Sequence, residues 1–393
     1  MTAAAQRYRV LGAERPYPWL AALAGAAVLA AAGAATGAYL MTAGHHVTGL
    51  TTTVAWGLPH VFAITLILAG AGAFALAALA PGLAADGEAW GRLGTLASLG
   101  LLLGGLAVLG LDLASPHRLL PPGELNLLSS FSRNILLYTG FTAVALLYLA
   151  TFLDPRLRRW NRAAGALGAL IAVLLALNVG SIFGLLPARP AYGGAIMLPL
   201  FAAAAAALGS AALALTWLAV THARGGAPSD AGLRGLGRAL LIAVGANAAL
   251  LAIHFLALLY LPGQQDHARF LLTDGGVYPA TFWLGAVAIG IIAPALLLLR
   301  GSGRPDGQAL ALASGLVIIG GLAQSFVMIV GAQAQPLAVL PGAEVVSAGF
   351  GEEAISYRPS GWELLLGIGG VGTALLVVLV GLRALPLAPA DGN

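Results

Sequence analysis

Ten apolar runs of about 20 residues, separated by shorter polar breaks, limit most strongly how this chain can fold. At ~1.5 Å per residue, a helix of that length crosses the ~30 Å hydrocarbon core of a bilayer. Only 9% of the residues are charged and 59% are hydrophobic, whereas roughly 25% of a soluble domain is charged. We therefore predict an all-α membrane protein and exclude a soluble domain.

The apolar runs define the expected spans and divide the chain. The spans are Trp19–Met41, Gly57–Leu79, Leu93–Leu113, Ile135–Leu153, Ala164–Leu185, Ala195–Val220, Leu236–Leu261, Pro279–Leu299, Ala309–Val330 and Glu363–Leu382. The first run is longer than the apolar region of a cleaved signal peptide, so we interpret it as a helix. We expect a segment 1–18, a membrane domain 19–385 and a tail 386–393. Two four-helix bundles plus an extra helix pair would accommodate ten helices.

Arginine predicts the orientation, because all 19 basic side chains are arginine. Fourteen of the 19 lie at the two termini and in the even-numbered loops, and four crowd the loop after the fourth run, at Arg156, Arg158, Arg159 and Arg162. The positive-inside rule then places both termini in the cytoplasm, with the protein in the cell inner membrane. Because the arginines follow membrane side and form no single basic face, we expect no nucleic-acid partner.

The chain contains no cysteine, which excludes disulfides, thiolate nucleophiles and cysteine-ligated iron–sulfur clusters. Electrons for any redox reaction must then come from a partner, a quinone or a histidine-ligated haem. The loop histidines, at His45–His46 and His267, show no tight ligand spacing, and we predict no metal site.

Polar side chains inside the expected spans gather at one depth. They lie in the outer third of the bilayer under the predicted topology, at His60, Asp112, Asn178, Ser181, His254 and Gln324. Ionisable groups are costly in hydrocarbon and mark functional sites, and packing contacts alone would be spread over all depths. This convergence predicts a shared pocket near the outer surface.

A histidine beside a carboxylate suits quinone chemistry. The imidazole exchanges a proton with a ring oxygen near neutral pH, and the carboxylate passes that proton toward water. One alternative is a haem b ligated by His60 and His254. Two others are proton translocation along Asp112 and Asn247, and a solute transporter, whose site would lie near the bilayer midplane.

Several motifs carry a family resemblance over residues 45–385. Trp56-Gly-Leu-Pro-His60, Asp112-Leu-Ala-Ser-Pro116-His-Arg118 and Ala188-Arg189-Pro190-Ala-Tyr192 resemble segments of the NrfD/PsrC family of quinone-interacting membrane subunits. Further stretches resemble its ten-helix DsrP branch, the membrane subunit of the DsrMKJOP complex. Among them are His46-Val-Thr-Gly49, Asp274-Gly-Gly-Val-Tyr-Pro279 and Pro359-Ser-Gly-Trp-Glu363. The hydrogenase subunit HybB is the nearest competing branch.

The resemblance implies a subunit, not an enzyme alone, that exchanges electrons between quinol or quinone (menaquinone or ubiquinone) and a periplasmic ferredoxin-like iron–sulfur protein. It implies no haem or iron–sulfur cluster in this chain. For the DsrP branch it adds a multihaem cytochrome c, a haem b membrane subunit and a cytoplasmic iron–sulfur subunit, all serving sulfur metabolism.

The resemblance also assigns residues to the expected quinone site. His60 matches the pocket histidine and Asp112 the turn aspartate, and these two are the expected catalytic residues. Trp56, Asn178, Ser181, Arg118, Arg189 and His254 are the further expected binding residues. The chain departs from the family pattern at Ala114, where some members carry a pocket glutamate, and at Tyr192, where tryptophan is typical.

Overall fold

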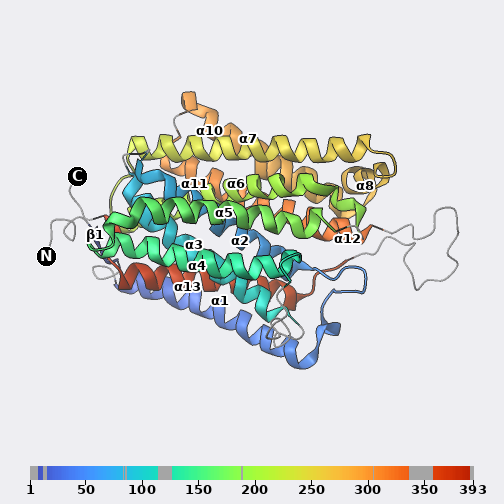
Figure 1. Ribbon diagram of the computed structural model, residues 1–393, viewed down its shortest axis with the longest axis horizontal. Coiled ribbons are helices and arrows are strands. Elements are labelled where there is room, and N and C mark those ends of the chain that lie inside the picture. The colour runs from blue at the N-terminus through green and yellow to red at the C-terminus, as the bar shows by residue number, and fades with distance from the viewer. Residues whose placement is uncertain are drawn as a thin grey trace.

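The computed structural model describes residues 8–11, 16–82, 84, 86–113, 126–186, 189–303, 305–335 and 357–389. The long helices lie side by side along one axis, as Figure 1 shows. Within the described residues, ten helical segments are long and apolar enough to cross a membrane. The chain is thus an all-α, multi-pass membrane protein, as predicted.

The ten spans are built from regular and irregular helix. The α-helices are α1 Pro16–Ala43, α2 Leu58–Leu79, α3 Gly87–Leu111, α4 Ser130–Leu153, α5 Asn161–Gly184, α6 Met197–Ala223, α7 Asp230–Tyr260, α8 Gln265–Arg269, α9 Val277–Ala280, α10 Ala293–Gly303, α11 Gly307–Phe326, α12 Ala332–Ala334 and α13 Gly361–Ala384. Three π-helical segments join them, η7 Phe270–Asp274, η8 Thr281–Ile292 and η9 Val327–Gly331. Single 3-10 turns are η1 His45–Val47, η2 Ala80–Gly82, η4 Arg158–Trp160, η5 Pro190–Tyr192 and η6 Gly194–Ile196.

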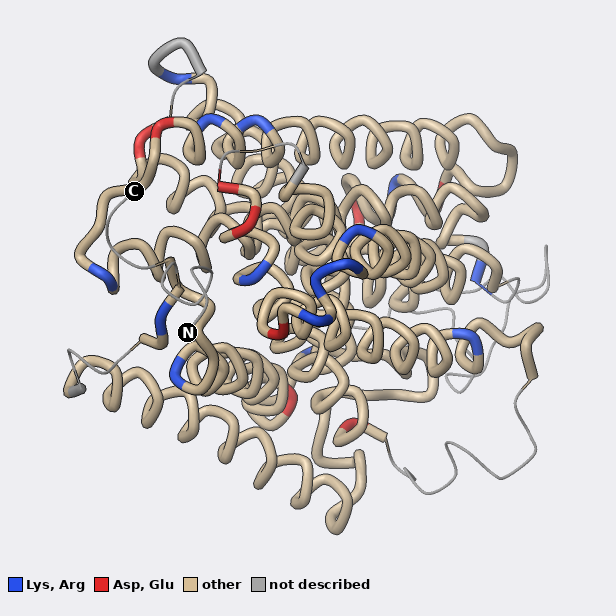
Figure 2. Tube along the Cα trace, turned by 60° about the vertical axis from the view of Figure 1, so that its left-hand side comes forward, with Lys and Arg blue, Asp and Glu red and all other residues tan. Residues whose placement is uncertain are grey.

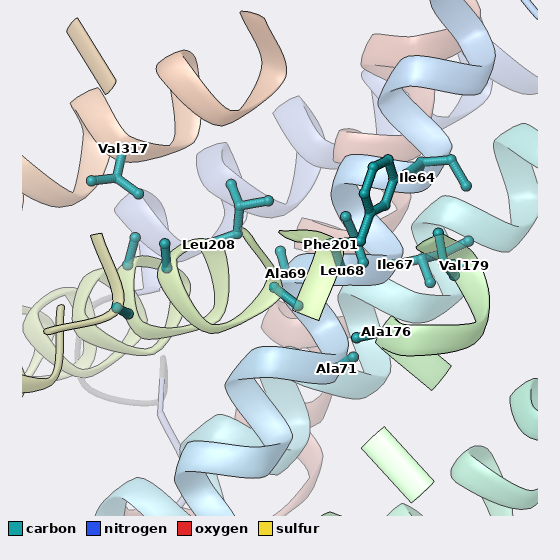
Figure 3. Packing of buried hydrophobic residues seen from close by; sticks show 14 of the residues in the cluster. Ile64, Ile67, Leu68, Ala69, Ala71, Ala176, Val179, Phe201, Leu208 and Val317 are labelled. Atoms are coloured by element: carbon teal, nitrogen blue, oxygen red, sulfur yellow. The ribbon is translucent and has the colours of Figure 1, made fainter. Parts of the chain in front are cut away.

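Helix α2 is the centre of the assembly. Its most apolar stretch is 78% buried, against 22% for α1 at the edge, and it packs against α3, α5, α6, α11 and α13. Figure 3 shows the close packing of apolar side chains from α2, α5, α6 and α11. The grouping into two four-helix bundles plus an extra helix pair stays a prediction.

Glycines set the closest helix approaches. A Cβ added to Gly72 of α2 would lie 1.7 Å from the carbonyl oxygen of Ala205 in α6, and one added to Gly33 of α1 would lie 2.5 Å from Cα of Gly369 in α13. In lipid the hydrophobic effect does not drive helices together, so close packing and weak polar contacts must do so. Backbone contact at glycine provides such packing. The small residues therefore determine which helices pair.

The eighth span changes helix type along its length. Segment η8 is π-helical and gives way to α10 just before Pro294. Proline has no N–H to donate to the preceding turn, and this loss is a recognised cause of irregular helix. Gly290 of η8 and Gly320 of α11 touch through their backbones, since a Cβ on Gly320 would lie 2.0 Å from Cα of Gly290.

The start of α1 and the end of α13 lie at one end of the helix bundle, here called the terminal end (Figure 1). There Tyr8–Arg9 (β1) pairs antiparallel with Ala388–Pro389 (β2). Arg92 of α3 lies 3.7 Å over the Tyr8 ring, and Arg224 donates a 2.6 Å hydrogen bond to the carbonyl of Pro389. Figure 2 shows the arginines of this region in blue. The opposite end, here called the site end, holds the start of α2 and the end of α3.

Candidate functional site

His60 lies in the first turn of α2 at the site end. Gly57 is the N-cap of that helix and Pro59 follows within its first two positions, where a missing N–H is harmless and φ is already helical. His60 is buried, and its Nδ1 lies 3.9 Å from Oδ2 of Asp112. The fold thus brings together the two expected catalytic residues from different helices.

Asp112 ends α3 as its C-cap residue. Its other carboxylate oxygen, Oδ1, is buried and has no hydrogen-bond partner among the described residues. A buried acceptor without a donor costs about 1–3 kcal/mol, so this atom calls for a donor from a ligand or water. The pair therefore offers one imidazole and one free carboxylate oxygen.

Trp56 provides an aromatic wall beside His60. The two rings stack with centroids 5.8 Å apart and planes tilted by 19°. Phe183 of α5 meets the indole edge-on at 5.4 Å, and Phe131 of α4 lies 6.4 Å from it. A planar aromatic ligand fits such a surface because offset stacking is favourable.

Gln333 of α12 holds the Trp56 segment and was not identified from the sequence. Its Oε1 accepts hydrogen bonds from the N–H groups of Ala55 (3.0 Å) and Trp56 (3.1 Å). Its Nε2 donates to the carbonyls of Trp56 (3.0 Å) and Ile329 (2.8 Å). One buried amide therefore satisfies four backbone groups and fixes the indole.

Arg189 reinforces the same segment from the loop after α5. Its guanidinium donates to the carbonyl of Gln333 (3.1 Å) and to that of Thr53 (2.9 Å). The sequence placed this arginine in the binding site, whereas the structure shows it bonded to backbone carbonyls. Arg118, the other arginine of the expected site, lies outside the described residues.

Asn178 and Ser181 of α5 belong to a neighbouring polar cluster with α4. Asn178 Oδ1 accepts from Arg133 Nε (2.8 Å), and its Nδ2 donates to Asn134 Oδ1 (2.8 Å). The hydroxyls of Ser181 and Ser130 are 2.9 Å apart. No hydrogen bond joins this cluster to His60 or Asp112 among the described residues; Trp56, with Phe131 and Phe183, connects the two sets.

His254 of α7 is fully buried, and neither ring nitrogen has a hydrogen-bond partner in the part of the chain that the structure describes. It contacts Phe255, and a Cβ added to Gly193 would lie 2.8 Å from its Cε1. These contacts are distinct from those of His60. Asn247 and Gln324, also among the polar residues of the spans, form a reciprocal amide pair between α7 and α11, with bonds of 2.7 and 3.1 Å.

A second carboxylate lies close to the start of α2, and sequence reasoning missed its role. Glu363 of α13 is fully buried and accepts a hydrogen bond from the Tyr357 hydroxyl. That hydroxyl in turn accepts from the N–H of Leu58 (2.7 Å). The available signal was Ser360-x-x-Glu363, a capping-box pattern, and the structure forms that box.

The arrangement suits proton exchange with a flat, hydroxyl-bearing ring. His60 is able to accept or return a proton, Asp112 stabilises the charged imidazole and has one oxygen free, and Trp56 supplies a stacking surface. In the described part of the chain, no three His, Asp or Glu side chains gather to hold a metal ion.

Comparison with known proteins places this geometry in context. The sequence model of the family described as polysulphide reductase, NrfD, matches residues 46–337. The chain is 27% identical over 373 residues to the Hdr-like menaquinol oxidoreductase integral membrane subunit of Archaeoglobus fulgidus, covering 92% of this chain and 93% of that protein. It is 24% identical over 233 residues to a selenate reductase subunit of Mesobacillus selenatarsenatis, covering 58% of this chain and 52% of that protein.

Proposed function

Because this chain belongs to the polysulphide reductase NrfD family, we propose that it is the quinone-reactive membrane subunit of an oxidoreductase complex. The observation that carries the proposal is the His60–Asp112 pair beside Trp56, in which the buried Asp112 Oδ1 has no partner within the described part of the chain. A quinol hydroxyl would donate to that oxygen, and a quinone carbonyl would accept from the imidazole. The relative named as a menaquinol oxidoreductase subunit supports a naphthoquinol as the substrate.

In the proposed reaction, quinol oxidation releases two protons and two electrons. His60 takes the first hydroxyl proton, and Asp112 stabilises the resulting imidazolium from 3.9 Å. That proton leaves through Asp112 toward the site-end surface, and the regenerated imidazole then takes the second hydroxyl proton, which leaves by the same route. Both electrons leave to a redox centre of a partner subunit, since this chain lacks cysteine. Quinone reduction runs the same proton steps in reverse.

The proposed complex follows the family resemblance. We expect the site end to face the periplasm and a ferredoxin-like iron–sulfur subunit to dock there, with both termini in the cytoplasm. The DsrP branch would add a multihaem cytochrome c, a haem b membrane subunit and a cytoplasmic iron–sulfur subunit. In the proposed site, Asn178 and Ser181 lie behind the aromatic rings and support them without contacting the quinone. His254 lies apart from the site.

The test is electron transfer from 2,3-dimethyl-1,4-naphthoquinol to the redox centres of the purified complex, followed by stopped-flow absorbance. His60→Ala should lower the rate by about 10²–10⁴-fold, the usual contribution of a positioned acid–base group, with the composition of the complex unchanged. His46→Ala is the matched control, because His46 is an exposed imidazole at the same end, and it should retain the native rate. Full activity in the His60 variant would contradict the proposal. A haem absorbance spectrum that disappears when His60 or His254 is substituted would instead identify the chain as a cytochrome subunit.

A further inference from the structure

Glu363 is an unusual buried group near the start of α2. Its side chain has no exposed surface. One carboxylate oxygen accepts from the Tyr357 hydroxyl, and the other accepts from the N–H groups of Gly49 (2.9 Å) and Ser360 (2.7 Å). Three donors converge on the two carboxylate oxygens. This pattern suits an ionised carboxylate, which accepts hydrogen bonds and donates none.

Glu363 forms no ion pair among the described residues. The ion pairs found there join His60 to Asp112, Arg92 to Glu88 and Arg269 to Asp266. Burying a carboxylate without a cation is costly unless hydrogen bonds compensate. A capping box forms equally well with an exposed glutamate, so starting α13 does not explain why this one is buried.

The hydrogen bonds of Glu363 lead directly to the His60 turn. Tyr357 transmits the contact, since its hydroxyl donates to Glu363 and accepts from Leu58, two residues before His60. The backbone approaches closely at this point, because a Cβ on Gly57 would lie 2.5 Å from Glu363 Oε1 and 2.6 Å from the Tyr357 oxygen. The carboxylate therefore lies close to the N-cap Gly57 and, through the Tyr357 hydroxyl, is linked to the first N–H of α2.

The same helix also contacts α3, the helix that ends at Asp112. Helix α13 packs along α3, and a Cβ on Gly104 of α3 would lie 2.3 Å from the carbonyl of Gly370.

Burial raises the pKa of the Tyr357 phenol, the hydrogen bond and charge of Glu363 raise it further, and the charge of Asp112 adds a smaller rise. The phenol therefore stays protonated and continues to donate.

Helix α13 lies outside the segment that the family model matches, residues 46–337. The two helices that carry the proposed catalytic pair, α2 and α3, lie inside it. Their relative placement at the site end is thus connected to a helix beyond the matched range.

We propose that Glu363 is a positioning residue for the His60–Asp112 pair. Through Tyr357 it holds the first turn of α2, and through α13 it holds α3, so that the imidazole and the free carboxylate oxygen face one ligand. The inference rests on the proposed quinol reaction. It assigns to the tenth span a part in that reaction.

The test compares variants of Glu363 and Tyr357 with a helix-start control in the purified complex. Glu363→Ala should lower kcat/KM for 2,3-dimethyl-1,4-naphthoquinol by about tenfold or more, mainly through KM, because small misplacements of a site cost this much. Glu363→Gln should recover to within about threefold, since its oxygen accepts two N–H bonds and its NH₂ donates to the Tyr357 oxygen. Ser360→Ala is the matched control: it removes the hydrogen bond to the Glu363 N–H but leaves the path to α2.

The outcomes separate the alternatives. Equal effects of Ser360→Ala and Glu363→Ala would mean that Glu363 only starts α13, and would overturn the inference. If Glu363→Ala fails to assemble, Tyr357→Phe, which removes one hydroxyl, should still raise KM about threefold or more, and an unchanged KM would overturn it. Loss of turnover in His60→Ala without any effect at Glu363 or Tyr357 would refute this inference alone, whereas turnover unaffected by His60→Ala would refute the proposed function.

Discussion

Gln333 offers a sharp test of how the aromatic wall is held. The perturbation is Gln333→Ala, at a side chain that is only 3% exposed. Three of its four hydrogen bonds run to the Ala55–Trp56 backbone at 3.0–3.1 Å. At about 1 kcal/mol net per bond, the amide contributes about 3 kcal/mol to holding that segment.

That energy converts into an expected change in substrate binding. About 1.4 kcal/mol corresponds to tenfold, so ~3 kcal/mol gives an upper limit near 100-fold in the population with Trp56 in place. Arg189 still holds Thr53 in the variant, and its bond retains part of that order. We therefore expect a rise in the KM for naphthoquinol of about 10- to 100-fold with a smaller change in kcat.

The assay is the same stopped-flow reaction, with the composition of the complex measured in parallel. Gln335→Ala is the control, because Gln335 is a buried amide two residues away that pairs with His267 of α8 instead. Its KM should stay within about twofold of the native value. A Gln333 variant that assembles and keeps the native KM would refute the reasoning that these bonds hold the ring.

Three further changes have defined outcomes. Gly72→Ala should lower the melting temperature in detergent, because the new Cβ would lie 1.7 Å from the Ala205 oxygen. Gly245 has open space around it, so Gly245→Ala should leave the melting temperature unchanged or raise it. Burial raises the pKa of the Tyr357 phenol in the folded protein, so the unfolded chain deprotonates first as the pH rises above the ordinary phenol pKa of about 10. Its contribution to stability is therefore complete below that pH and is lost above it. Tyr357→Phe should flatten the decline in melting temperature between pH 9 and 11, and an unchanged slope would contradict this. Asn178→Ala should slow naphthoquinol oxidation far less than His60→Ala in the stopped-flow assay, because its hydrogen bonds go to Arg133 and Asn134; equal losses would place it in direct contact with substrate.

The spans were predictable because hydrocarbon imposes length and apolarity on each helix. The expected Gly57–Leu79 corresponds to α2 at Leu58–Leu79. The fourth span begins earlier than expected, at Ser130 instead of Ile135. Its first turns carry Ser130 and Arg133, which look like loop residues in a sequence but bond to α5 in the fold.

The site was predictable only in part, because the roles of some residues depend on contacts with residues far away in the sequence. His60 and Asp112 were singled out because ionisable groups are costly in hydrocarbon, both were expected at one depth, and both match family motifs. The structure places them 3.9 Å apart. Gln333 and Glu363 lie beside polar loop sequence, where amides and carboxylates are ordinary. Only their contacts to residues 277 and 314 positions away in the chain show their roles, and a single sequence gives no view of such pairs.

The pairing of the first helix with the last has a consequence for biosynthesis. Helix α1 packs mainly against α13, so while the ribosome is still translating the intervening helices, α1 sits in the membrane without its principal neighbour. Glu363 emerges with that same last helix, and β2 follows it to close on β1. A chain translated only as far as α11 therefore lacks the hydrogen bonds of Glu363 and Tyr357 around the start of α2, and these form only after α13 has been translated.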